Sequence, residues 1–382
     1  MRTNSLLLSL LLATTSAFAQ SPGLTLPYDG NSQKAVVTQF IGPVQVTIEY
    51  SSPKVHGPGG ADRRGKIWGE LVGYGMADLG FPPGRLGPWR AGANENTVFA
   101  VSHPVLIEGK PLAAGRFGVH VLVQPINGEE GWTIVFSKNS TSWGSFTYDP
   151  AEDALRVTVK PRKHEYREYL TYEFSRREPA EAVVELQWED IALPWSIGVQ
   201  NIEDIYISQL KNELRGAPGF SWQNLNAAVQ YALGVNKHLD IALQWADAAI
   251  SAPFVGQANF TTLSAKASVL SKLGRASDAK PLREQALNHP SATLLQIHQY
   301  GRQLLAAGKK QEALEVFLLN AKRFGDVWPI EVGLARGYLA TGDNAKALEH
   351  ARKAAAQAPD PLNKRNLEAM VKAISEGKPF TN

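Results

Sequence analysis

The feature that most constrains the fold is a 34-residue interval in the second half of the chain. Gly274, Gly308 and Gly342 are separated by this interval. It also relates three further sets of positions: Ala279, Ala313 and Ala347; Ala267, Gly301 and Ala335; and Leu270, Leu304 and Tyr338. Small residues suit positions where two helices approach closely, and glycine suits the turn between them. The interval therefore predicts a stack of helical hairpins, one hairpin per period.

The repeated unit resembles the tetratricopeptide repeat, a helix–turn–helix motif of the same length. The segments "LAAGKKQEALEVF" and "LATGDNAKALEHA" contain its turn and second helix. We expect repeats over 222–359, with three full repeats in Phe260–Pro359 and an earlier, offset one. Residues 360–382 then supply a capping helix and a tail, because the open end of such a stack needs a polar cover.

The first half of the chain has a different period, which is typical of β-strands. In "PVQVTIEYSSP", Val44, Val46 and Ile48 fall on one face, and similar short segments follow between Gly, Pro, Asn and Asp. No helical stretch separates these strands, which disfavours a parallel α/β fold. We therefore expect an antiparallel, jelly-roll-like β-sandwich over 34–200, joined by a linker (201–221) to the helical repeats.

The N-terminus has the pattern of a secretory signal peptide over 1–19. Arg2 supplies its positive charge, Leu6–Leu12 its apolar core, and Ala17–Ala19 a small-x-small cleavage site. Residues 20–33 would then form a flexible N-terminal segment. The chain contains no cysteine, which excludes disulfides, thiolate metal ligands and a cysteine nucleophile. We expect a soluble exported protein, periplasmic or secreted after cleavage near Ala19.

Composition and motifs exclude several classes of function. The formal charge is 39 − 36 = +3, without a long basic run, so nothing indicates a nucleic-acid surface. No second apolar stretch has the length of a membrane span. The chain lacks a phosphate loop, a dinucleotide fingerprint, a G-x-S-x-G elbow and an H-E-x-x-H helix. The sequence thus predicts neither a metal nor a cofactor.

A series of spaced motifs gives the β half a family resemblance. In order, these are "YSSPKVHG", "GKIWGELVGYG", "WRAGANENT", "VLIEGKPLAAGRFGV", "GWTIVFSK" and "SWGSFTYDPAEDALRVTV". Together they resemble the bacterial exported family called domain of unknown function 2911, over roughly residues 39–199. The resemblance implies compartment and fold rather than a reaction. This chain departs from the family pattern by insertions at 58–64 and 77–88, and by His120, where an aromatic residue is expected.

The "WRAGANENT" segment is the main candidate for a ligand site. Three interpretations stay open for Arg90 and Glu95. The Arg90 guanidinium can bind a carboxylate or phosphate through two hydrogen bonds. Glu95 can act as a general base if burial raises its pKa. Alternatively, the two side chains pair and brace the loop, with Asn94 capping backbone groups.

Other side chains of the β half complete this hypothetical site. The ligand-binding candidates are Arg90, Asn94, Glu95, Lys66, His56, His120 and Trp143. Trp143 lies in a turn-rich stretch and is the tryptophan most expected to be exposed, whereas Trp132 lies in a strand and is expected in the core. If the protein is an enzyme, Glu95 and His120 are the candidate catalytic residues, in a hydrolase or isomerase acting on a sugar or peptide.

The helical repeats point to a protein or peptide partner. A stack of hairpins forms a groove lined by the first helix of each pair. Four polar residues are candidates for this partner-binding groove: Gln296, Gln299, Arg302 and Arg336. The sequence therefore favours an exported binding or scaffold protein without catalysis, whose β domain holds a small molecule or sugar or stabilises the array. A cell-envelope enzyme is the alternative.

Overall fold

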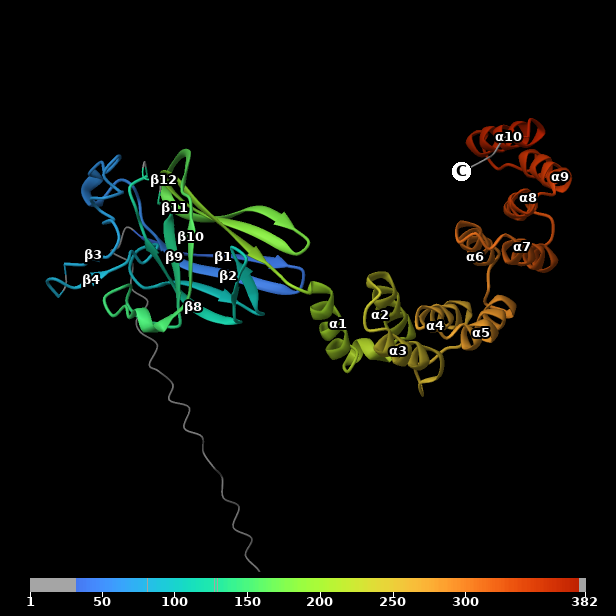
Figure 1. Ribbon diagram of the computed structural model, residues 1–382, viewed down its shortest axis with the longest axis horizontal. Helices are drawn as coiled ribbons and strands as arrows, with labels where there is room; N and C mark the ends of the chain where they lie inside the picture. The colour runs from blue at the N-terminus through green and yellow to red at the C-terminus, as the bar shows by residue number, and fades with distance from the viewer. Residues whose placement is uncertain (1–31, 81, 127, 129, 378–382) are drawn as a thin grey trace, which may run out of the picture. The chain divides into compact units, whose positions relative to one another are not determined.

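A computed structural model describes residues 32–80, 82–126, 128 and 130–377 (Figure 1). The predicted signal peptide (1–19), nearly all of the segment 20–33 and the last residues of the tail lie outside the described residues. The chain divides into two compact units, with the boundary in the sequence between Ile202 and Glu203. The first is rich in strands and the second is helical, as the change of sequence period predicts. Among the described residues, no helix is long and apolar enough to cross a membrane.

Antiparallel sheets form the first unit. The larger sheet has the order β1 (Gln33–Ile41), β2 (Val44–Ser52), β5 (Thr97–Val101), β8 (Gly115–Leu122), β9 (Trp132–Ser137) and β10 (Asp153–Val159). The second has the order β11 (Arg162–Glu178), β12 (Glu181–Gly198), β6 (Val105–Ile107) and β7 (Lys110–Leu112). A small ribbon joins β3 (Ala77–Asp78) to β4 (Leu86–Gly87). Short 3-10 helices lie at η1 (Pro58–Gly60) and η2 (Pro150–Glu152).

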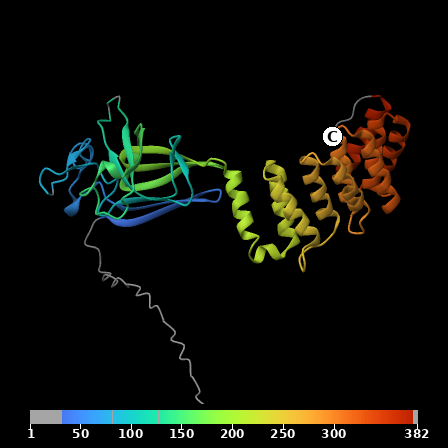
Figure 2. The ribbon, with the colours of Figure 1, turned by 60° about the horizontal axis from the view of Figure 1, so that its bottom comes forward.

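The strands of the larger sheet follow chain order, so this sheet is a meander. This order refines the jelly-roll-like expectation, because β6 and β7 leave the meander to extend the second sheet. Figure 2 shows β1 and β2 (blue) on one side of the unit and β11 and β12 (yellow-green) across from them. The rings of Tyr50 and Tyr172 meet between these layers, with centroids 4.7 Å apart.

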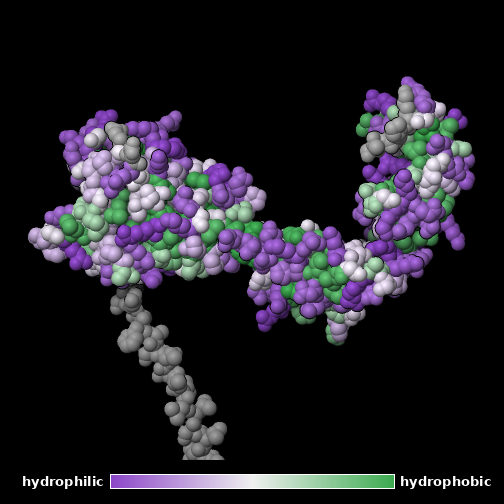
Figure 3. All heavy atoms as spheres, in the orientation of Figure 1, coloured by the Kyte–Doolittle hydropathy of each residue, from purple (hydrophilic) through white to green (hydrophobic). Residues whose placement is uncertain are grey.

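The core of the β unit follows from the alternation of apolar residues along its strands. Val44, Val46 and Ile48 are all at most 1% exposed, so the predicted inward face of β2 is confirmed. Burying such side chains stabilises a fold by about 1.5–3 kcal/mol each relative to leaving them in water. On the face seen in Figure 3, hydrophobic and hydrophilic residues are interspersed.

Four tryptophans form a cluster inside the β unit. The Trp68 ring contacts Trp89, Trp132 and Trp188, with centroids 4.8 to 5.8 Å apart. Trp132 is fully buried and Trp188 is 1% exposed, whereas Trp143 is 58% exposed. Indole rings bury large apolar areas, and tilted or edge-on contacts add to the packing. The abundance of tryptophan in this half therefore reflects its core more than a surface platform.

The second unit is a stack of helices. Its elements are α1 (Ile202–Glu213), η3 (Ala217–Phe220), α2 (Trp222–Val235), α3 (Leu239–Ser251), α4 (Phe260–Lys272), α5 (Ala276–Asn288), α6 (Leu294–Ala306), α7 (Lys310–Phe324), α8 (Trp328–Thr341), α9 (Asn344–Ala356) and α10 (Pro361–Ser375). Successive helices from α2 to α9 pair as hairpins, and α10 packs on α9. The stretch 201–221, expected to be a linker, instead contains α1, because Ile207 packs into the core formed by α2, α3 and α4.

The 34-residue interval corresponds to the geometry of the hairpins. Gly274, Gly308 and Gly342 all have positive φ, between 75° and 89°, at the turn between two helices. This left-handed conformation is the one that glycine adopts without a steric penalty. The alanines five residues further on are at most 1% exposed, because they lie where the paired helices touch. The predicted turns and close contacts are therefore confirmed.

Candidate ligand sites

The "WRAGANENT" loop makes hydrogen bonds to both sheets of the β unit. The backbone of Trp89 pairs with Val121 of β8 through reciprocal hydrogen bonds of 3.0 and 2.7 Å. The carbonyl of Ala91 accepts hydrogen bonds from the Thr97 hydroxyl (3.0 Å) and from the Tyr172 hydroxyl (2.8 Å) of β11. Ala91 and Asn94 have positive φ, which a loop tolerates only where surrounding contacts hold it. The loop conformation is thus fixed from both sheets.

Arg90 braces this loop against the segment that contains Trp143. Its guanidinium donates a hydrogen bond of 2.5 Å to the Asn94 carbonyl and lies over the Phe146 ring, 4.9 Å from the centroid. Burial lowers the pKa of the guanidinium from its ordinary value. Arg90 nevertheless stays charged at neutral pH, since an arginine pKa lies far above 7. The contacts of Arg90 are those of a structural clamp between two loops.

Replacing Gly144 by alanine is expected to loosen this clamp. A Cβ built on Gly144 falls within 3.0 Å of the Arg90 guanidinium, and Gly144 has a φ of +64°. Overpacking of this kind costs about 1–3 kcal/mol, in addition to the strain of a left-handed alanine. Chemical denaturation of the purified protein measures the loss. Gly109→Ala is the matched control, because Gly109 has a φ of +75° and no neighbour within 4 Å. Equal losses in both variants would contradict the clamp.

Glu95 takes partners other than Arg90. Its carboxylate pairs with the Lys34 ammonium at 3.0 Å and accepts a 3.3 Å hydrogen bond from the Ser51 hydroxyl. Burial raises the pKa of Glu95, but the Lys34 ammonium, the backbone amide and Ser51 outweigh it and leave the pKa below its usual value. The general-base interpretation required the opposite shift. The proposed Arg90–Glu95 pair is also wrong, because local sequence separation does not decide which way two side chains of a loop point.

His120 is a buried, neutral residue of β8. It is 2% exposed, and its Nδ1 lies 2.9 Å from the Ser145 hydroxyl. Burial, together with the nearby Arg90 charge, lowers the pKa of His120 to about 4. Its ring also contacts Tyr148, with centroids 5.3 Å apart. His120 therefore fills a core position, which agrees with the aromatic residue expected there from the family pattern.

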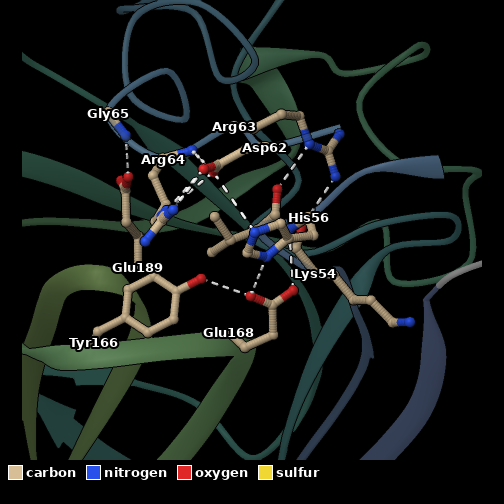
Figure 4. A network of polar contacts seen from close by, with 10 residues as sticks. Lys54, His56, Asp62, Arg63, Arg64, Gly65, Tyr166, Glu168 and Glu189 are labelled. Carbon is tan, nitrogen blue, oxygen red and sulfur yellow. Dashed lines mark hydrogen bonds and ion pairs between the residues drawn. The ribbon is translucent and has the colours of Figure 1, made fainter. Parts of the chain in front are cut away.

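His56 belongs to a separate polar network, shown in Figure 4. Its backbone amide and its Nδ1 contact the two carboxylate oxygens of Glu168, at 3.0 and 2.8 Å. The Tyr166 hydroxyl donates to the same carboxylate at 2.6 Å. Burial raises the pKa of Glu168, but these hydrogen bonds overcome it and lower the pKa to about 2. Across the network, Asp62 pairs with Arg64 at 2.7 Å.

Glu168 and Tyr166 are partners of His56 that the sequence did not predict. They lie in and beside "KPRKHEYR", a segment whose charges alone indicate a solvated hairpin. His56 and Glu168 are 112 positions apart, and only the pairing of β11 with the segment after β2 brings them together. No local signal distinguishes this half-buried glutamate from the exposed glutamates of the same strand.

The residues predicted for one ligand site do not share a cavity. Arg90 lines a cavity of about 620 Å³ with Trp89 and Trp188, whereas Glu95 lines a different one of about 220 Å³. The other candidates are placed apart: His120 in the core, Trp143 on the surface, His56 in the Glu168 network, and Lys66 on an exposed loop. The arrangement gives no support to catalysis by Glu95 and His120 together. Within the described residues, no cluster of His, Asp and Glu could hold a metal ion.

The larger cavity is walled by the two segments that depart from the family pattern. Pro58 and Arg63 come from the first inserted segment, and Asp78 and Leu79 from the second. We call this space the insert cavity; its other lining residues are Ser32, Pro53, Lys54, Leu71, Val72, Gly73, Ala77, Gly87, Pro88, Trp89, Arg90, Gly92, Ala93 and Trp188. The insertions therefore build a pocket wall and are not only surface loops.

The helical unit has a cavity of about 290 Å³ where α4 and α5 meet α6. We call it the repeat groove; it is lined by Gln230, Phe260, Thr261, Ser264, Ala265, Ser268, Arg283, Leu287, Gln296, Gln299, Tyr300 and Gln303. Two of the predicted groove residues, Gln296 and Gln299, thus line it. Gln296 also has a structural task, because its side chain accepts from the backbone amide of Thr293 at 3.0 Å and completes the capping box of α6.

Arg302 and Arg336 lie on neighbouring helices, α6 and α8, outside the lining of the repeat groove. Arg302 follows Gln299 by three residues, so both project from the same side of α6. Burial lowers the pKa of Arg336, and the Arg302 charge lowers it further. His298 lies beside them; burial first, and then the charges of Arg336 and Arg302, lower the pKa of His298 to about 4. In the described part of the chain neither arginine has an ion pair, so this region of the surface is positively charged.

Comparison with known proteins agrees with the family resemblance. Residues 32–197 match the family described as "Protein of unknown function (DUF2911)". Comparison with curated proteins gives no match. Among solved structures, a thermophilic TPR protein from Thermus thermophilus is similar at 17% identity and a TM-score of 0.30, over 46% of this chain and 91% of that one. Residues 32–197 therefore form a domain of the DUF2911 family, and a stack of helical hairpins follows it.

Proposed function

We propose that this protein is an exported binding protein whose repeat groove holds a peptide or an extended segment of a partner protein. The observation that carries the proposal is the set of free amide side chains in the groove. Gln230, Gln299 and Gln303 line it and have no hydrogen-bond partner among the described residues. The N-terminal sequence pattern supports a periplasmic or secreted location, where such a protein would meet its partner.

Glutamine amides suit the backbone of an extended peptide. Each amide presents both a donor and an acceptor, as a peptide unit does. Hydroxyls from α4 add short polar contacts, and the Tyr300 ring gives a flat wall with the Arg283 guanidinium 5.7 Å from its centroid. The groove therefore combines adaptable hydrogen bonding with one aromatic contact, a combination common in surfaces that bind peptides.

The arginine pair gives this groove a preference in charge. Arg302 and Arg336 repel each other across α6 and α8, and no described carboxylate neutralises them. An acidic side chain of a bound peptide would relieve that repulsion and gain hydrogen bonds to guanidinium groups, which are stronger than neutral ones. We therefore expect the preferred peptides to carry Asp or Glu next to the segment held by the glutamines.

A peptide-display selection on the full chain tests the proposal. Enriched peptides are expected to be acidic, and fluorescence anisotropy of a labelled one gives its affinity. The double variant Gln299→Ala/Gln303→Ala is expected to bind about tenfold more weakly, and Arg302→Gln/Arg336→Gln to bind more weakly with a reduced salt dependence.

Gln311→Ala is the matched control, because Gln311 lies on α7 and does not line the groove. It is expected to bind with the affinity of the natural chain. Failure to enrich any peptide, or equal affinity in the groove variants and in the control, would overturn the proposal.

A further inference from the structure

We propose that the insert cavity of the β unit binds an organic anion with a flat apolar body, such as an aromatic carboxylate or sulfonate. The cavity has a volume of about 620 Å³, within the range of roughly 300–1,000 Å³ that is usual for small-molecule sites. It lies in the β unit, so the proposal stands apart from the repeat groove and either can fail alone.

The walls of the insert cavity favour a flat, apolar body. Trp89 and Trp188 stack with an interplanar angle of 16° and centroids 6.0 Å apart. Leu71, Val72 and Leu79 add aliphatic surface around the same space. Aromatic and aliphatic walls of this kind are typical of pockets that enclose small organic molecules. A small inorganic anion would leave most of this surface uncovered.

The charges around the insert cavity favour an anion. Lys54, Arg63 and Arg90 line it, against a single carboxylate, that of Asp78. Within the described residues, none of the three cations is in an ion pair. Such an excess of one sign in a partly enclosed space attracts ligands of the opposite charge.

The two arginines are already held by backbone carbonyls. Arg63 donates to the carbonyls of Val55 and Lys54 at 3.0 and 2.9 Å, and Arg90 donates to the carbonyl of Asn94. Carbonyl partners fix the guanidinium groups but leave their net charge uncompensated.

Lys54 is the cation best able to contact a ligand directly. Figure 4 shows its side chain extending away from the His56–Glu168 pair, and its ammonium lies 5.7 Å from the centroid of the Tyr169 ring. A lysine on a flexible stem adjusts to an anionic group more readily than a clamped arginine does. The indole N–H of Trp188 is buried without an acceptor among the described residues. An oxygen of the ligand that reached it would satisfy that donor.

The proposal is tested with two dyes that share an aromatic body and differ in charge. The full chain is titrated with anilinonaphthalene sulfonate and, separately, with uncharged N-phenylnaphthylamine, and quenching of tryptophan fluorescence is measured. The sulfonate is expected to bind saturably at one site, at least about tenfold more tightly than the neutral dye. Equal affinities, or quenching that does not saturate, would overturn the proposal.

Three variants locate the site. Lys54→Gln is expected to weaken sulfonate binding about five- to tenfold and to leave the neutral dye unaffected. Lys66→Gln is the matched control, an exposed lysine of the neighbouring loop that does not line the cavity, and it is expected to change nothing. Leu79→Trp fills the space and is expected to abolish binding of both dyes. Unchanged sulfonate binding in Lys54→Gln, or retained binding in a folded Leu79→Trp variant, would contradict the proposed site.

Discussion

The substitution Phe317→Ala is expected to lower the free energy of unfolding of the helical unit by about 3–5 kcal/mol. Phe317 of α7 is 1% exposed, and its ring lies in a slot made by glycines of two other helices. A Cβ built on Gly301 or Gly333 falls less than 3.0 Å from this ring, and one built on Gly337 falls 3.0 Å from it. The absence of a side chain at these three positions is therefore what admits the ring.

The cost lies in the range usual for a buried phenylalanine, and glycine neighbours limit how far the slot can refill. When a ring is removed, neighbouring side chains normally move to reduce the cavity. Here three of the neighbours are glycines, which have no side chain to move. The His298 ring also contacts Phe317, with centroids 5.6 Å apart. On the glycine side, the void left by Phe317→Ala has no side chain that can fill it.

Urea denaturation followed by far-ultraviolet circular dichroism measures this loss in the full chain. Leu318→Ala is the matched control, because Leu318 is the next residue of α7 and is 43% exposed. It is expected to cost less than about 1 kcal/mol. If the two variants lose equal stability, the glycine slot does not hold the third hairpin against the fourth.

The β unit is expected to lose about 3 kcal/mol of stability as the pH falls from 6.5 to 4, through His120 alone. Its pKa is about 4 in the folded protein and 6.5 when unperturbed, with burial as the main cause and the Arg90 charge as a smaller one. Between these pH values the unfolded chain binds a proton that the folded chain does not, so stability decreases on acidification. Well above pH 6.5 both states are neutral at this residue, and its contribution is constant.

The variant His120→Phe separates this effect from other acid-sensitive groups. Phenylalanine keeps a ring in the core but has no proton to bind, so stability should depend less on pH between 4 and 6.5. Denaturation curves at several pH values give the slope for each protein. His164→Phe is the matched control, because it makes the same substitution at a histidine of β11 that is not buried. The Nδ1 of His164 lies next to the Glu165 carbonyl. An unchanged slope in His120→Phe would show that His120 is not the group that titrates.

The sequence alone predicted the features that depend on local geometry. The alternation of Val44, Val46 and Ile48 placed one face of β2 in the core, because successive residues of a strand point to opposite sides. The interval between Gly274, Gly308 and Gly342 predicted the hairpin turns, because few residues other than glycine adopt positive φ without strain. Ordered motifs across 39–199 were enough to recognise the DUF2911 domain.

The tertiary structure decided which side chains meet. Arg90 and Glu95 are close in the sequence, yet one contacts Asn94 and Phe146 while the other pairs with Lys34. The loop's direction is set by hydrogen bonds from Thr97 and Tyr172, which no local pattern encodes.

Cavities and polar networks follow the same rule, because their members come from distant segments. His56 meets Glu168 only through the pairing of β11, and the insert cavity forms only where two insertions face Trp89 and Trp188. The periods of strands and helices are set by the sterics of neighbouring residues, and a single sequence therefore reveals them. The partners of a side chain are set by strand register and helix packing, and these are fixed only when the whole unit folds.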